Sequence, residues 1–67
     1  MTEPHPNIPK LLERGAQSIS NGEIETARAL WEPHRNHPEI LAHLAWLERS
    51  QGHYTKALQY YMELHNR

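Results

Sequence analysis

The sequence predicts an all-α fold made of two stacked antiparallel helical hairpins, four helices in all. Two segments that lie thirty residues apart, 21–31 and 51–61, share one pattern. Each has a polar residue before a glycine, an apolar or aromatic residue two places after it, an alanine three further on and an aromatic residue four after that. A fixed period of this size in a helix-forming chain indicates hairpins that bury their apolar faces by stacking.

Length and composition restrict the function. With 67 residues the chain makes one domain at most, of a size at which a single core supplies only about 3–5 kcal/mol. Cysteine is absent, which excludes disulfides and thiolate metal sites. Seven basic and eight acidic residues form no charged block, so we expect no nucleic-acid partner. No apolar run reaches the roughly 18–20 residues of a membrane span, and no signal peptide is recognisable, so we expect a cytoplasmic protein without membrane contact.

Two parts are predicted along the chain. Residues 1–8 are rich in proline and poor in apolar residues, which favours a flexible N-terminal arm. Residues 9–67 form the helical domain, with hairpins at about 9–35 and 38–66. We expect no C-terminal capping helix, so one end of the stack should be adhesive.

Prolines and glycines set the expected helix boundaries. The first helix is predicted at about 9–20, and Gly22 follows it. The second begins near residue 23 and ends by about 35, short or kinked, because Pro33 removes a backbone donor. The third begins at about 38, with proline in its first turn, and the fourth is predicted at about 54–65.

Apolar spacing assigns the buried faces of the last two helices. The third helix is apolar over more than one stripe and should be the central element. These residues are Ile40, Leu41, Leu44, Ala45, Trp46 and Leu47. The stripe predicted for the fourth helix consists of Tyr54, Ala57, Leu58, Tyr61, Met62 and Leu64.

The second hairpin resembles the tetratricopeptide repeat, a helix-turn-helix unit that binds other proteins. The residues at the spacing of that family are Leu41, Leu44, Ala45, Gly52, Tyr54, Ala57 and Tyr61. The corresponding residues of the first hairpin are Leu11, Gly15, Gly22, Ile24, Ala27 and Trp31. Small residues allow two helices to cross closely, which Gly15 with Ala27 and Ala45 with Ala57 can provide.

Three features depart from the family pattern. The period is thirty residues instead of about thirty-four, a difference of roughly one helical turn. Arg14 stands at a usually apolar position, and Leu12 can substitute for it through a shift of one residue. Ser18 and Glu48 stand where the family has an aromatic residue late in each first helix.

The resemblance implies that the first helices of the two hairpins line a concave surface that binds a peptide or helix of a partner protein. On this chain that surface would present Leu12, Ala16, Ile19, Ala42, Trp46 and Arg49. Trp46 is the expected anchor, since the core residues beside it direct it to another side and large rings are favoured at interfaces. Arg49, Glu39 or His43 would orient the ligand. The alternative is that Trp46 packs under the arm or into the core.

The fourth helix offers a second predicted interface, consisting of Tyr60, Met62, Leu64 and His65. These residues could form a homodimer face or dock a different protein. The alternative is an aromatic cluster with ordinary exposed tips.

Six histidines in 67 residues raise the hypothesis of a metal-binding regulator. His34 and His37 are three residues apart and could share a metal ion in the turn, although a structural or surface role is the alternative. The third ligand would come from His5, His43, His53 or Glu32.

No nucleophile context or phosphate loop is present, and four short helices should leave little room for a pocket, so we expect neither an enzyme nor a cofactor. The sequence predicts an adaptor or small chaperone that binds protein. The alternative is a homo-oligomeric structural subunit of a larger assembly.

Overall fold

The computed structural model describes residues 7–66 and has an all-α fold without strands in this range. Its elements are α1 (Ile8–Ser20), α2 (Ile24–Trp31), the 3-10 helix η1 (Glu32–His34), α3 (Pro38–Ser50) and α4 (Tyr54–His65). The predicted helix boundaries are confirmed to within one or two residues, apart from the η1 turn. None of these helices has the length and apolar character needed to cross a bilayer. Most of the predicted arm at 1–8 lies outside the described residues.

Local sequence explains the ends of the helices. The Asn7 side chain accepts a hydrogen bond from the backbone N–H of Lys10 at 3.1 Å, which caps the start of α1. Gly22 and Gly52 follow α1 and α3 with φ of 81° and 82°, a conformation that favours glycine. Pro33 lies in η1, so α2 ends after only two turns, as predicted.

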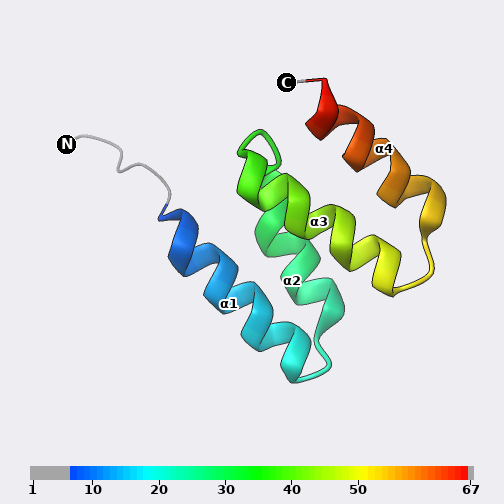
Figure 1. Cartoon of the computed structure of the whole chain (residues 1–67). Helices are drawn as coiled ribbons and strands as arrows, with labels where there is room; N and C mark the ends of the chain where they lie inside the picture. Colours follow the sequence, from blue (N-terminus) through cyan, green and yellow to red (C-terminus); the bar gives the residue numbers. More distant parts are fainter. Residues whose placement is uncertain (1–6, 67) are drawn as a thin grey trace.

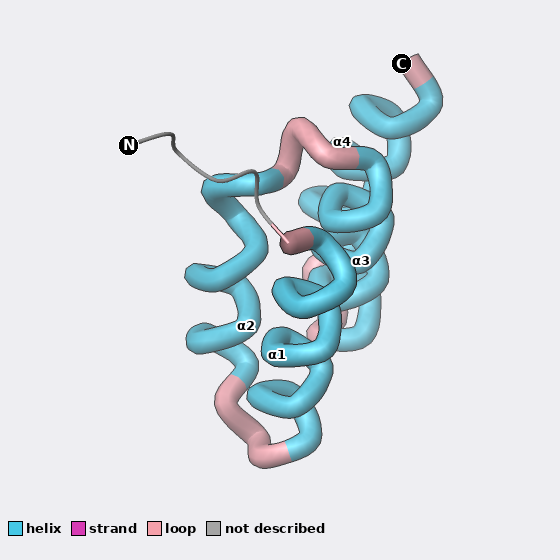
Figure 2. The backbone as a smooth tube through the Cα atoms, turned by 90° about the vertical axis from the view of Figure 1, so that its left-hand side faces the viewer, coloured by secondary structure: helices cyan, strands magenta, loops and turns pink. Residues whose placement is uncertain are grey.

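The two hairpins lie side by side with α3 at the centre (Figure 1). The backbone of α3 lies close to α1, α2 and α4, whereas the backbone of α4 lies close only to that of α3 among the described elements. The Cα atoms extend over 41 × 32 × 14 Å, so the molecule is flat. In the view turned by 90°, α1 lies in front with α2 to its left, and α3 and α4 lie behind and to the right of α1 (Figure 2). The prediction of a central third helix is therefore confirmed.

The core lies around α3. The fully buried apolar side chains of this helix are Ile40, Leu41, Leu44, Ala45 and Leu47. Trp31 from α2 and Tyr60 from α4 complete the core from the two sides, together with Ala27. The small residues predicted at the helix crossings, including Ala57, are all buried.

A buried carboxylate joins the two hairpins. Glu48 of α3 is 1% exposed and accepts hydrogen bonds from Nε of Arg28 at 2.7 Å and from Nδ1 of His53 at 2.8 Å. Arg28 also pairs with Glu25. Burial alone would raise the pKa of Glu48, but the hydrogen bonds from Arg28 and His53 outweigh it and lower that pKa. Glu48, which departs from the family pattern, is thus an ionic contact between repeats.

The stripe predicted for the fourth helix is wrong in most of its members. Ala57 is buried and Leu64 packs partly against the core, but the other predicted members are exposed. These are Tyr54, Leu58, Tyr61 and Met62. Tyr60, which was not in the stripe, is 2% exposed and faces α3. Apolar and aromatic residues cover a broad side of α4, wider than one contact with α3 can bury, so spacing alone did not determine which part of it faces the core.

Tyr60 has a complete set of polar partners. Its hydroxyl donates to Oε2 of Glu32 at 2.7 Å, and the guanidinium of Arg35 lies 5.3 Å from its ring centre. Arg35 also binds Glu32 and Glu63. Burial is the main cause that raises the pKa of Tyr60, and the hydrogen bond to Glu32 raises it further. The ring therefore connects α4 to the end of the first hairpin.

Candidate functional site

A hollow of about 420 Å³ opens between α1 and α3, with the indole of Trp31 at its base. We call it the Trp46 groove. Its lining residues are Ala16, Ile19, Trp31, Ala42, His43 and Trp46. All but His43 are apolar or aromatic, so the groove suits apolar side chains. The expectation that the chain has little room for a pocket is therefore wrong.

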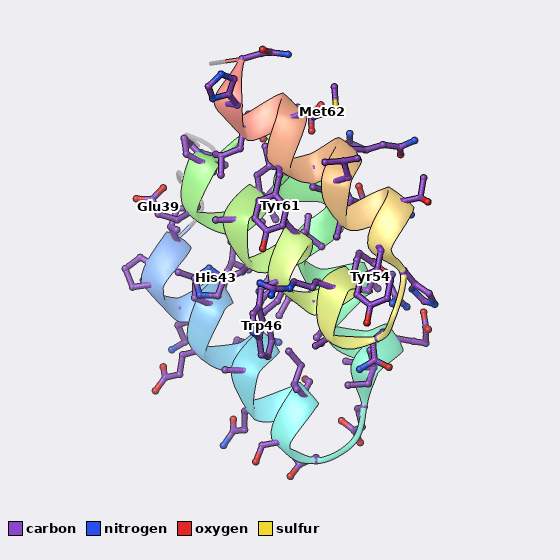
Figure 3. All side chains as sticks on the ribbon, turned by 45° about the vertical axis from the view of Figure 1, so that its right-hand side comes forward. Glu39, His43, Trp46, Tyr54, Tyr61 and Met62 are labelled. Atoms are coloured by element: carbon purple, nitrogen blue, oxygen red, sulfur yellow. The ribbon has the colours of Figure 1, made fainter. Side chains whose placement is uncertain are left out.

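Trp46 is directed into solvent by the pattern of its own helix. Five neighbouring positions on α3 are occupied by core residues, and Trp46 lies on the opposite side with 49% of its surface exposed. Ala42, one turn earlier, leaves space beside the indole. Figure 3 shows Trp46 and His43 on the outer side of α3. The structure thus does not place Trp46 in the core, which was one alternative; the other, packing under the arm, concerns residues outside the described range.

His43 is the polar group of the groove. Its Nδ1 lies 2.8 Å from the backbone oxygen of Glu39, and since a carbonyl can only accept, Nδ1 carries the hydrogen. In the neutral ring, Nε2 then remains as a hydrogen-bond acceptor. The ring also packs edge-on against Trp31, with centroids 5.6 Å apart and planes at 73°. The tautomer and the orientation of His43 are therefore defined by its own helix and by α2.

Four of the six residues predicted for the concave surface line this groove. They are Ala16, Ile19, Ala42 and Trp46. Leu12 packs partly against the core, and Arg49 is exposed outside the lining. Trp31 was missed as a lining residue because the sequence matched it only to the repeat pattern and not to the predicted concave surface, which the first helices of the hairpins were expected to form. That these residues bind a partner protein stays a prediction.

The second predicted interface is not formed as expected. Tyr60 is buried and Leu64 is partly buried, because both face α3 and the core. Met62 and His65 are exposed, with Met62 at 55%. The four residues therefore do not share one surface.

The histidine hypothesis gains no support from the described residues. The rings of His34 and His37 are 6.4 Å apart, but among residues 7–66 no three histidine or acidic side chains are grouped to hold a metal ion. His53 is bound to Glu48. His5, one candidate for the third ligand, lies outside the described residues.

Comparison with models of known protein families finds no match for this chain, and comparisons with curated proteins and with solved structures find none either. The resemblance to the tetratricopeptide repeat therefore rests on the residues named above.

Proposed function

We propose that the chain is a protein-binding module, an adaptor or small chaperone, that holds a helix or peptide of a partner protein in the Trp46 groove. The observation that carries this proposal is the half-exposed indole of Trp46 beside an apolar hollow of about 420 Å³. A partner that binds over a large exposed ring removes the surface of that ring from water, and such rings are frequent anchors of interfaces.

The groove suggests the chemistry of the ligand. Its apolar lining favours a helix or peptide that inserts one or two apolar side chains between α1 and α3. Nε2 of His43 can accept a hydrogen bond from such a ligand, and exposed Arg49, one turn after the lining, can attract an acidic group. We therefore expect the partner segment to be amphipathic, with a hydrogen-bond donor near its apolar anchor.

Catalysis has less support. Among residues 7–66, His43 is the one titratable side chain that lines the groove, and no nucleophile or second acid-base group of this range lines it. The resemblance to a repeat family that binds proteins also favours the binding role.

The test is selection of helical peptides from a displayed library on the wild-type protein, followed by titration of each selected peptide. Trp46→Ala should weaken binding by about 2 kcal/mol, roughly thirtyfold, because the anchor is lost. Its thermal melting should change little, since the ring is not in the core.

Tyr54→Ala is the matched control, because it removes an aromatic ring that is 69% exposed and lies outside the groove. It should leave peptide affinity unchanged at low protein concentration. Selected peptides that bind Trp46→Ala as tightly as the wild type would rule the groove out.

A further inference from the structure

Because the two hairpins share a thirty-residue repeat, the buried positions of α2 can be compared with the equivalent positions of α4. Trp31 and Arg28 of α2 face α3, where the indole packs on His43 and the guanidinium binds Glu48. Thirty residues later the same two positions are Tyr61 and Leu58 of α4. Tyr61 is 38% exposed and Leu58 is 58% exposed, whereas Trp31 is 1% exposed. The side of the second hairpin that corresponds to the α3-binding side of the first is therefore uncovered.

This side of α4 has the spacing of a coiled-coil contact. We call it the α4 seam, and it consists of Tyr54, Leu58, Tyr61, Met62 and His65. Tyr54, Leu58, Tyr61 and His65 follow one another at intervals of four, three and four, and Met62 lies beside them. Such intervals place all four on one line of a helix that pairs with another helix. Four of the five exposed large apolar side chains within residues 7–66 belong to this seam. Figure 3 shows Tyr54 and Tyr61 on the side turned to the viewer.

The other end of the stack is polar, which decides how two copies can meet. On α3, Ile40, Leu44 and Leu47 are fully buried and belong to the core shared by the two hairpins. Thirty residues earlier, α1 has Lys10, Arg14 and Gln17, all exposed. Head-to-tail stacking of α1 on the α4 of another copy would bury these charges without an evident partner, which is costly.

We propose that the α4 seam is an interface with the same seam of a second copy, in an antiparallel arrangement with two-fold symmetry. The seam has no Lys, Arg, Asp or Glu, so two copies meet without charge repulsion or buried charges. With the axis between residues 58 and 61, Leu58 faces the second copy's Tyr61 and Tyr54 faces the second copy's His65. A hollow of about 210 Å³ lined by Tyr61, Met62, His65 and Asn66 lies where the ring of that Tyr54 would enter.

The size of the seam indicates a weak dimer. Its large side chains expose on the order of 400 Å² of apolar surface, about half of the roughly 800 Å² that each partner buries in a standard interface. We therefore expect association to be reversible and to depend on concentration. This interface is separate from the Trp46 groove, so it can be tested independently of peptide binding.

The first experiment is sedimentation of the 67-residue chain between about 10 µM and about 1 mM. The wild type should shift from the mass of one copy toward two. Leu58→Lys should weaken dimerisation at least tenfold, since it places two ammonium groups in the apolar contact. Gln59→Lys is the control, because this exposed neighbour lies outside the seam and adds the same charge. A wild type that stays monomeric at the highest concentration overturns the proposal.

A mixing experiment tests the antiparallel register. Leu58→Lys and Tyr61→Glu should each fail to dimerise alone, but an equimolar mixture should form a heterodimer in which the new lysine faces the new glutamate. A mixture as monomeric as its components would overturn this register. Both residues are exposed, so circular dichroism should show the wild-type helix content. Should one variant unfold, the other compared with Gln59→Lys still decides whether the seam is the interface.

Discussion

The indole of Trp31 lies directly on the backbone of α1 at Gly15. A β-carbon at Gly15 would overlap Cε2 of Trp31. The indole Nε1 also donates a hydrogen bond to the backbone oxygen of Leu11 at 2.8 Å, one turn earlier. The absence of a side chain at one residue therefore allows the ring to reach the backbone of the first helix.

Gly15→Ala should destabilise the protein by about 1–3 kcal/mol, because the added methyl group displaces the indole and its hydrogen bond. In an unobstructed helix the same change would stabilise by up to about 1 kcal/mol, so the sign of the effect is informative. Urea denaturation measures it. Gln17→Ala, at an exposed position of the same helix, is the control and should change stability little. A stabilised Gly15→Ala protein would show that the ring is not held there.

Glu48→Gln should lower the free energy of unfolding by about 3 kcal/mol, because it leaves the partly buried Arg28 without its main counter-ion. Glu25→Gln is the matched control. Its carboxylate also pairs with Arg28 but has 85% of its side chain exposed, so the expected loss is below about 1 kcal/mol. Chemical denaturation at neutral pH compares the two. Equal losses would mean that the contact between the hairpins is no stronger than a surface ion pair.

The lowered pKa of Glu48 also predicts sensitivity to acid. In the unfolded chain this group should titrate near its ordinary value of 4.5, and in the folded protein it titrates below that value. Its contribution to stability is therefore fully present above the unfolded pKa and is lost as the pH falls through the folded one. Thermal melting followed from about pH 7 to about pH 3 should show a steeper decline for the wild type than for Glu48→Gln. Parallel curves would exclude Glu48 as the source.

Tyr60→Phe should destabilise the protein by about 1.5–3 kcal/mol, since it removes a buried hydroxyl that donates to the Glu32 carboxylate. Tyr61→Phe is the control at the next residue, where the ring is 38% exposed. It should have almost no effect on thermal unfolding. A larger loss of stability for Tyr61→Phe than for Tyr60→Phe would contradict this structure. It would mean that α4 buries the side predicted from the sequence.

Much of the backbone could be predicted from the sequence, because local residues determine it. Pro33 and Pro38 delimit the turn between the hairpins, and Gly22 and Gly52 supply positive φ where two helices end. The thirty-residue repeat predicted two similar hairpins. Trp46 was predicted to face away from the core, because the apolar positions around it on α3 are sufficient for packing.

Tertiary structure decided what depends on partners distant in the chain. Ala57, Leu58, Tyr60 and Tyr61 are all compatible with a buried side of α4, and the packing of Tyr60 into the core with its hydrogen bond to Glu32 decides between the two tyrosines. The burial of Glu48 likewise depends on the guanidinium of Arg28, twenty residues earlier, and no local sequence pattern predicts that pairing. The sequence thus determined where the helices begin and end, through backbone preferences that act over a few residues. Which sides they bury was settled by side-chain packing between helices.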